Sequence, residues 1–171
     1  MTGEKTIYYC LQCGSDKYKN ISSKQFLCES CGYTYFQNIA ASVAAIIECH
    51  NQILVCTRKF DPCRGKLCFP GGFVDMNESA ESALKREVFE ELKIEISEMR
   101  YVGSFPNVYL YKHVEYHTLD FFFSLKLEEV PQITVGEEIA AIKWIEKDKI
   151  NYDGFAFESI KWGLQRYSDL S

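Results

Sequence analysis

Residues 69–94 read FPGGFVDMNESAESALKREVFEELKI, and the rest of the chain is interpreted outward from this stretch. Its second half predicts an amphipathic helix over residues 79–92. Ser79 is a suitable N-cap for this helix, and Glu81 in the first turn complements the helix dipole. Apolar residues recur at every fourth position and form one stripe: Ala80, Leu84, Val88 and Leu92. The preceding Pro70-Gly71-Gly72 segment forces an irregular backbone, so a bend feeds directly into the helix.

The acidic side chains of this predicted helix lie close to its apolar stripe. At about 100° per residue, Glu87, Glu90 and Glu91 fall within an arc of roughly 100° that overlaps the edge of the stripe. Carboxylates crowded beside a buried face repel one another and resist desolvation, so they need a compensating cation. Lys85 and Arg86 supply part of that charge, and a hard divalent ion such as magnesium would supply the rest. The competing interpretation is an ordinary acidic surface helix.

The composition excludes several broad classes of protein. The 171 residues include 24 acidic and 19 basic side chains, and the net charge of -5 argues against a protein that coats nucleic acid or anionic membranes. A hydrophobic content of 47% excludes disordered and fibrous classes. The longest apolar run, residues 39–47, is too short to span a bilayer, and residues 1–5 lack the features of a signal peptide. We therefore expect a soluble, cytoplasmic protein with no membrane partner.

Four of the eight cysteines form two Cys-x-x-Cys-Gly motifs. The cysteines of these motifs are Cys10, Cys13, Cys28 and Cys31. Two thiolates three positions apart can grip one metal ion, and the glycine after each pair permits a left-handed turn. Four thiolates without an open position predict a structural zinc site, which replaces a hydrophobic core in so small a segment. We therefore assign residues 1–35 to a zinc ribbon and residues 36–171 to a second domain.

Other interpretations of the cysteines are weaker. Unrelated buried cysteines would not repeat one motif, and a redox Cys-x-x-Cys would not need a second pair. Residues 8–33 carry three lysines against two acidic side chains, so no basic patch favours nucleic acid as a partner. The other cysteines are expected to be reduced thiols, with a second metal site at Cys63 and Cys68 as a minor alternative. They are Cys49, Cys56, Cys63 and Cys68.

The chain from residue 36 onward predicts one α+β domain. Residues 39–48 and 52–58 are apolar or β-branched, and the short polar segment between them indicates a β-hairpin. Residues 61–66 predict a loop, and residues 69–74 a short strand. Further strands are expected over residues 100–104, 118–127 and 140–145. A final amphipathic helix is expected over residues 155–167, with core candidates Phe155, Ile160, Trp162 and Leu164.

The motif Gly72-x5-Glu78-x7-Arg86-Glu87-Val88-x-Glu90-Glu91-x-Lys93-Ile94 resembles the Nudix box, the signature of the Nudix hydrolases. It departs from the box once, because Lys93 stands where the box has glycine, at a position that favours a left-handed C-cap. No metal ligand is lost by this departure. The resemblance extends to residues 41–58, 69–75 and 137–144. A four-cysteine ribbon before such a domain is similar to the branch that contains NADH pyrophosphatase and ADP-ribose pyrophosphatase.

This resemblance implies a Nudix fold, in which a mixed β-sheet is sandwiched between helices, preceded here by the ribbon. It implies hydrolysis of a nucleotide-linked diphosphate by attack of water, with magnesium or manganese as cofactor and a structural zinc in the ribbon. The metal ligands implied are Glu87, Glu90 and Glu91. Arg86 would orient these carboxylates, and Glu78 would support the box.

The catalytic base is left open. Glu90 and Glu138 are both candidates, and the sequence does not separate Glu138 from the adjacent Glu137.

The substrate is open as well. The NADH pyrophosphatase branch carries a Ser-Gln-Pro-Trp-Pro-Phe-Pro segment after the box, whereas residues 103–107 here read Gly-Ser-Phe-Pro-Asn. NADH, ADP-ribose and similar compounds therefore remain candidates. The backbone at Gly71 and Gly72 can approach phosphates because no side chain intervenes. Aromatic side chains that could stack on a base are Phe105, Tyr109, Tyr111 and Tyr116, although some of them can equally be sheet core.

A non-catalytic module that senses a nucleotide or binds RNA or protein is the competing hypothesis. It is disfavoured because every carboxylate of the box is present. The resemblance also suggests a homodimer.

Overall fold

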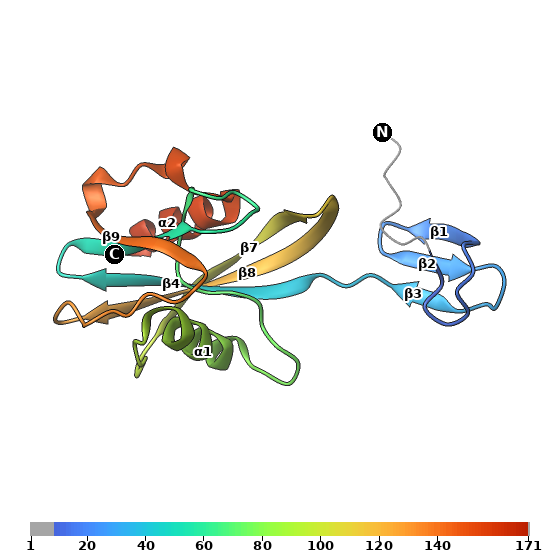
Figure 1. The fold of residues 1–171 in the computed structure, drawn as a ribbon, viewed down its shortest axis with the longest axis horizontal. Helices are drawn as coiled ribbons and strands as arrows, with labels where there is room; N and C mark the ends of the chain where they lie inside the picture. Colours follow the sequence, from blue (N-terminus) through green and yellow to red (C-terminus); the bar gives the residue numbers. More distant parts are fainter. Residues whose placement is uncertain (1–8, 171) are drawn as a thin grey trace.

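The computed structural model describes residues 9–170, which form two separate β-sheets and two α-helices (Figure 1). The first eight residues of the predicted ribbon, and Ser171, lie outside the described residues. The small sheet consists of β1 (Tyr18–Ser22), β2 (Gln25–Cys28) and β3 (Thr34–Phe36), all antiparallel. Its side chains form a core of their own around Tyr18 and Phe26.

The large sheet contains β4 (Ala40–Cys49), β5 (Gln52–Arg58), β6 (Leu67–Cys68), β7 (Arg100–Tyr111), β8 (Val114–Leu127) and β9 (Ile139–Glu146). The strand order is β6-β5-β4-β8-β7, and β9 pairs with β5. Strands β4 and β8 are parallel, from Ala40 opposite Thr118 to Cys49 opposite Leu127, and the other pairs are antiparallel. The predicted mixed sheet is therefore confirmed.

Each face of the large sheet is covered by one helix (Figure 1). Helix α1 (Ala80–Leu92) buries Ala83, Leu84, Val88 and Leu92 against one face. Helix α2 (Glu158–Leu170) buries Ile160, Leu164 and Tyr167 against the other face. Two short 3-10 helices, Lys147–Lys149 and Tyr152–Gly154, connect β9 to α2. The α+β architecture expected from the sequence is confirmed.

Two local predictions were wrong. Residues 69–74 are not a strand, because Gly71 has φ +145° and the chain makes only an isolated bridge between Phe73 and Ser42 there. The pairing strand is β6, just before that segment. Trp162 was expected in the core but is 45% exposed. It lies two positions from both Ile160 and Leu164, and at about 100° per residue this places it on the other side of α2.

The predicted hairpin of β4 and β5 is confirmed, whereas β7 and β8 are longer than predicted and form a second hairpin. Its tight turn places Lys112 and His113 at positive φ, a two-residue geometry that suits the twist of the flanking strands. Residues 37–39 connect the small sheet to β4. Neither helix within residues 9–170 is long and apolar enough to cross a membrane.

Candidate functional site

The bend at Pro70-Gly71-Gly72 is fixed to β4 by main-chain hydrogen bonds. The N–H of Ala45 donates to the carbonyl of Pro70 over 2.8 Å, and the N–H of Val43 donates to that of Gly72 over 2.9 Å. Gly71 is required at its position, because a Cβ there would lie 2.0 Å from the carbonyl oxygen of Val43. The bend therefore runs tight against β4 and exposes its backbone toward α1.

Helix α1 begins and ends as its sequence predicts. The Ser79 side chain accepts a hydrogen bond from the N–H of Ser82, and Lys93 closes the helix in the left-handed conformation with φ 59°. These two caps fix which residues of α1 face the bend. Glu87 and Glu91 are one turn apart on that side of the helix.

Glu91 is held directly by the bend. Its Oε2 accepts a hydrogen bond of 2.9 Å from the N–H of Gly71. Burial raises the pKa of Glu91 to about 8 against the opposing effect of that hydrogen bond, and the charges of Glu87 and Glu138 add to the rise. Glu91 is thus a partly buried carboxylate whose ionised form is only partly stabilised by the N–H of Gly71 and the charge of Arg58.

Glu87 lies against the second glycine of the bend. A Cβ on Gly72 would be 2.5 Å from the Glu87 carboxylate, so glycine makes room for it. Burial raises the pKa of Glu87 as well, although Arg86 opposes the rise, and the charges of Glu90 and Glu138 contribute to it. Glu87 and Glu91 are therefore two neighbouring carboxyl groups that resist ionisation unless a positive charge lies beside them.

Arg86 joins three carboxylates of the box through hydrogen bonds. Its Nε and Nη2 donate to the two oxygens of Glu78 over 3.0 and 2.9 Å, a bidentate pair. Its Nη1 donates to Glu87 over 2.8 Å and to Glu90 over 3.3 Å, and Nη2 also reaches the carbonyl of Phe73 over 3.0 Å. The hydrogen bonds from Arg86 lower the pKa of Glu78, so this carboxylate anchors the arginine.

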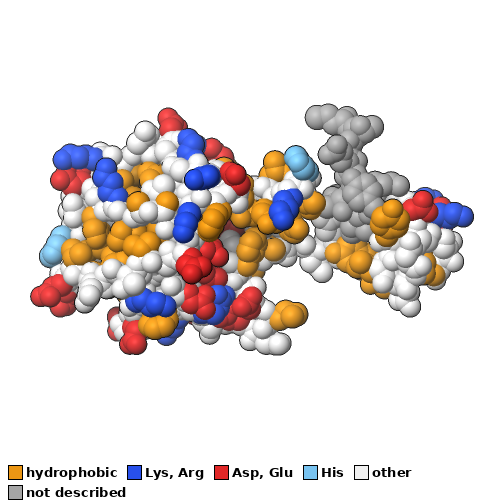
Figure 2. Space-filling view, viewed as in Figure 1, with side chains coloured by type: hydrophobic (Ala, Val, Ile, Leu, Met, Phe, Trp, Pro, Cys, Tyr) orange, Lys and Arg blue, Asp and Glu red, His pale blue; other side chains and the backbone are white. Residues whose placement is uncertain are grey.

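The loop before β9 brings Glu138 to the same place. The N–H of Gly136 donates to the carbonyl of Glu91 over 2.7 Å, and the N–H of Lys59 donates to that of Glu138 over 3.2 Å. The charge of Glu138 contributes to the raised pKa of both Glu87 and Glu91. Figure 2 shows acidic side chains gathered on this face of the molecule at and above α1.

The carboxylates suit a divalent cation without forming a closed cage. Their oxygens are hard donors, and their raised pKa values indicate that the ionised forms lack a compensating positive charge, which a bound cation would supply. Arg86 and the bend hold Glu87, Glu90 and Glu91 separately. Within residues 9–170, the cysteines of the ribbon are the only acidic, histidine or cysteine group whose ligand atoms all lie within 4.8 Å of one another.

Two cavities lie beside the bend and share the rings of Phe73 and Tyr109. These rings meet edge-on, with centroids 5.7 Å apart. The first, which we call the aromatic cavity, measures about 200 Å³ and is lined by Phe73, Tyr109, Tyr111 and Tyr116. Tyr109 and Tyr111, predicted to contact the substrate, both line this cavity. Phe105 lines neither cavity, because it packs against Phe122 and Trp162 on the α2 side of the sheet.

The second, which we call the polar cavity, measures about 100 Å³ and reaches Gly71 and Gly72. Sequence reasoning missed Arg58, which lines this cavity and lies over the rings of Tyr109 and Phe157 at 5.9 and 5.3 Å. Its Nε donates to the carbonyl of Pro62 over 2.8 Å, and among residues 9–170 it has no carboxylate within salt-bridge distance. The signal in the sequence that could have identified Arg58 is a single basic residue at the end of an apolar strand.

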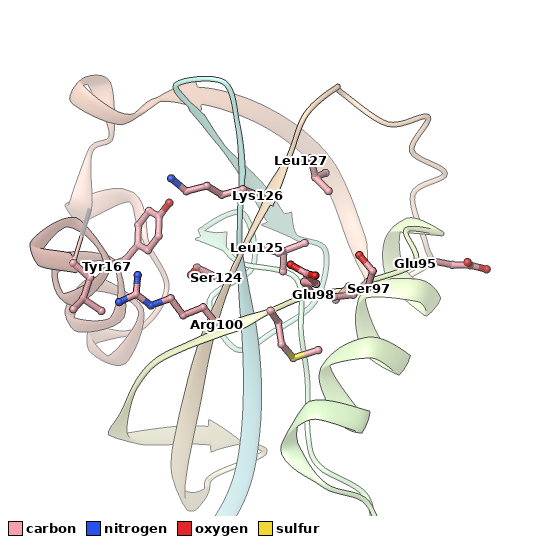
Figure 3. Close-up of a pocket in the computed structure, with 12 residues that line it drawn as sticks. Glu95, Ser97, Glu98, Arg100, Ser124, Leu125, Lys126, Leu127 and Tyr167 are labelled. Atoms are coloured by element: carbon pink, nitrogen blue, oxygen red, sulfur yellow. The ribbon is translucent and has the colours of Figure 1, made fainter.

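A larger cavity of about 510 Å³ lies away from the bend, between the loop after α1, the end of β8 and the end of α2 (Figure 3). It contains none of the predicted site residues. Beside it, the buried Glu48 accepts hydrogen bonds from the Tyr167 hydroxyl and, over 2.6 Å, from Lys147. Burial alone would raise the pKa of Glu48, but Lys147 and Tyr167 lower it, so this polar group is satisfied internally.

The cysteines of the ribbon do converge. The sulfur atoms of Cys10 and Cys31, and those of Cys13 and Cys28, are 3.7 Å apart. A tetrahedral zinc with bonds of about 2.3 Å to sulfur spaces its ligands by about 3.8 Å, so the cluster fits this metal. No second cysteine group forms around Cys63 and Cys68 within the described chain.

Known proteins resemble this chain. The family model described as "NUDIX domain" matches residues 37–163. The chain belongs to the Nudix family.

Among its Nudix relatives, a protein of Haemophilus influenzae named NAD-capped RNA hydrolase NudC is 34% identical over 104 residues, which cover 60% of this chain and 39% of the relative. A protein of the same name from Mannheimia succiniciproducens is 30% identical over 152 residues, covering 85% of this chain and 54% of the relative. This chain thus spans about half the length of these relatives, or less.

Solved structures show the same fold. A NUDIX hydrolase from Nitrosomonas europaea has a TM-score of 0.68 and 25% identity, over 95% of this chain and 91% of that one. The NUDIX domain of Shewanella oneidensis NrtR, solved with ADP ribose, has a TM-score of 0.66 and 17% identity, over 80% of this chain and 91% of that one. At that identity the second match supports the fold alone.

Proposed function

We propose that this Nudix protein hydrolyses a nucleotide-linked diphosphate of the NADH or ADP-ribose type in a magnesium-dependent reaction. The observation that carries this proposal is the set of partly buried carboxylates with raised pKa values that face the Gly71–Gly72 bend. A dense anion such as a diphosphate can approach them only through bridging cations. The names of the relatives, which refer to NAD-capped RNA, agree with a substrate of this class.

Glu87, Glu90 and Glu91 would hold magnesium or manganese through their oxygens. When bound, the ion would neutralise phosphate oxygens and make a coordinated water more acidic. Arg86 fixes the orientation of Glu87 and Glu90, and Glu78 fixes Arg86 in turn. Supporting contacts of this kind set the precision of a metal site.

The bend and the late loop would perform the remaining tasks. Gly71 and Gly72 let the phosphates approach the backbone, since neither carries a side chain. A carboxylate accepts the proton of the attacking water while the water oxygen bonds to phosphorus and the bridging P–O bond breaks. Glu138 is our preferred base because it adjoins Glu87 and Glu91 without being held by Arg86, unlike Glu90.

The ribbon would be stabilised by zinc on Cys10, Cys13, Cys28 and Cys31. Its boundary near residue 35, the cytoplasmic location and the homodimer stay predictions from the sequence.

The test is phosphate release or product formation from a panel of NADH, NAD⁺, ADP-ribose and related diphosphates, with and without magnesium. Glu91→Gln should lower turnover about a hundredfold or more, because it removes a ligand and not merely its support. Glu81→Gln is the matched control, since Glu81 is exposed on the first turn of the same helix. Turnover of Glu91→Gln within a few-fold of wild type would refute the metal assignment. No turnover of any compound would favour a nucleotide sensor.

A further inference from the structure

The floor of the polar cavity is unusual because it contains a buried carboxylate. Asp120 lies on β8 and is only 6% exposed, yet it lines the cavity together with Ser42, Asn107 and Thr118. Within residues 9–170 it has no cation within salt-bridge distance. A buried charge of this kind is retained only where hydrogen bonds satisfy it.

Hydroxyl groups fill most of the hydrogen-bond acceptor positions of this carboxylate. The Oδ1 of Asp120 accepts hydrogen bonds of 2.6 Å from both Ser42 and Thr118, and its Oδ2 accepts one of 2.6 Å from Ser159. A carboxylate offers about four acceptor positions, so one position on Oδ2 is left for a donor. Ser159 does not line the cavity, whereas Asp120 does.

Asn107 supplies the complementary group. It pairs with Thr118 across the β7–β8 hairpin, which makes it the diagonal neighbour of Asp120, about 7–8 Å away between Cα atoms. Its Oδ1 already accepts the N–H of Val108 over 2.9 Å, so its Nδ2 is left to donate. The lining of the polar cavity therefore includes one acceptor, on Asp120, and one donor, on Asn107.

We propose that Asp120 and Asn107 select the substrate by reading the edge of its ring. Asp120 accepts a hydrogen bond from an N–H on that edge, and Asn107 donates to the acceptor next to it. Adenine and a pyridine carboxamide both carry this donor–acceptor pair, whereas an unsubstituted purine lacks the donor and a pyridine carboxylate replaces it with a charge that Asp120 repels. This inference rests on the proposed function, and it adds which chemical group the site distinguishes.

The size and position of the cavity agree with this role. At about 100 Å³ it is smaller than the roughly 300–1,000 Å³ of a pocket for a whole ligand, so it takes the edge of one ring. Gly71, Gly72 and Arg58 line the same cavity, so the ribose and diphosphate joined to that ring would extend from it past the bend.

The experiment compares two matched pairs of substrates on the whole protein. The first pair is ADP-ribose and its analogue with unsubstituted purine. The second pair is NAD⁺ and its analogue with a carboxylate in place of the carboxamide. Wild type should prefer the N–H-bearing member of at least one pair about tenfold or more in kcat/KM, because the analogue leaves a buried polar group unpaired.

The variant Asp120→Asn should remove this preference. Ser42 and Thr118 both donate to Oδ1 of Asp120, so the amide of the variant keeps its oxygen at that position. Its NH2 group then points toward Ser159 and the cavity, where it meets the N–H donor of the substrate ring instead of accepting from it. Ser159→Ala is the matched control, because it loosens the same carboxylate from outside the cavity. The ratio within the discriminated pair should be unchanged in this control.

Absence of discrimination in wild type for both pairs would overturn the inference, as would an Asp120→Asn variant that keeps the wild-type ratio. If Asp120→Asn does not fold, Asn107→Asp is tested instead, because Asn107 is partly exposed. This variant should lower the kcat/KM ratio within the discriminated pair. Calorimetric binding of the same pairs without magnesium separates the two proposals. Selective binding without turnover would refute hydrolysis and support the ring-edge site.

Discussion

The ribbon and the Nudix box are two candidate metal sites that are built in opposite ways. In the ribbon, four sulfur atoms already lie within 4.8 Å of one another, with Cys10 and Cys28 buried and Cys13 and Cys31 exposed. In the box, the carboxylates are kept apart, with Glu91 on the N–H of Gly71 and Glu87 on Arg86. A closed cluster serves to hold the fold together, whereas separated and partly buried carboxylates leave room for metal, water and substrate.

The difference also shows which part of the chain depends on metal to fold. The ribbon has only a few buried side chains around Tyr18 and Phe26, so metal must supply most of its stability. Helix α1 instead buries four residues in the core of the large sheet. Removing metal from the box should therefore change chemistry without unfolding the domain.

The largest effect is expected from Cys28→Ser, which removes a fully buried ligand of the ribbon. Zinc binding contributes about 10–16 kcal/mol in small zinc modules, so we expect residues 9–36 to lose their fold. Zinc content and amide NMR signals of that segment measure the loss, while unfolding of the Nudix domain should be nearly unchanged. Cys63→Ser is the control, since Cys63 lies outside the cluster. A variant that retained stoichiometric zinc and a folded ribbon would contradict the assignment.

The next effect is expected from Arg86→Lys, which keeps the charge but not the fork of donors. One ammonium group cannot hold Glu78 in a bidentate pair and also reach Glu87 and Glu90. Loss of such support lowers activity or metal affinity about 10–100-fold. Magnesium titration of the hydrolysis rate measures it, with Lys85→Arg on the exposed side of the helix as control. Equal magnesium dependence of both variants would show that Arg86 does not organise the box.

An effect on stability smaller than that of losing zinc is expected from pH in magnesium-free buffer. The pKa of Glu91 is raised to about 8 in the folded state and lies near 4.5 in the unfolded state, so the protonated form is favoured by folding. The contribution of protonated Glu91 to stability is complete below its pKa in the unfolded state. This contribution is lost as the pH rises through its pKa in the folded state. Urea unfolding should therefore show a loss of roughly 3–4 kcal/mol between pH 5 and 8. Magnesium should reverse this loss, and Glu91→Gln should lack it. The same slope in Glu91→Gln would assign it to another group.

The smallest effect is expected from Lys93→Gly at the end of α1. In the ribbon, the left-handed positions after each cysteine pair are occupied by Gly14 and Gly32, whereas α1 ends on a lysine with φ 59°. Glycine removes that conformational cost but also removes the contact of Lys93 with the ring of Phe89. A net gain of about 0.5–1 kcal/mol is expected, with unchanged activity. Lys93→Ala, which keeps the cost and loses the contact, should be less stable than wild type. Thermal unfolding of the three proteins decides this.

Local signals explain what the sequence predicted correctly. The caps of α1, its apolar stripe and the tight turn between β4 and β5 each depend on a few neighbouring residues. The parallel pairing of β4 with β8 joins residues nearly eighty positions apart, and it was expected only through the resemblance to a known fold. The strand predicted over residues 69–74 was wrong. The apolar residues on both sides of two glycines are typical of a strand, but the backbone conformation of Gly71 interrupts strand pairing.

The sequence predicted the part of the candidate site that lies within the Nudix box. Glu78, Arg86, Glu87 and Glu91 meet as the spacing indicates. Asp120 was missed because it is one of several polar residues in β8, and only the structure shows its partners from β4 and α2 and its place in a cavity. Phe105 was included because alternation along a strand does not say which face of the sheet holds the substrate.

The close approach of Gly71 to β4 has a consequence for protein engineering. Any side chain at this position would displace the carbonyl of Val43, so a library aimed at new substrates gains nothing by varying it. The tip of the β7–β8 hairpin, by contrast, projects from the sheet and contributes Tyr111 and Tyr116 to the aromatic cavity. Diversity concentrated on that hairpin would explore new specificities while the reactive end of the molecule keeps its shape.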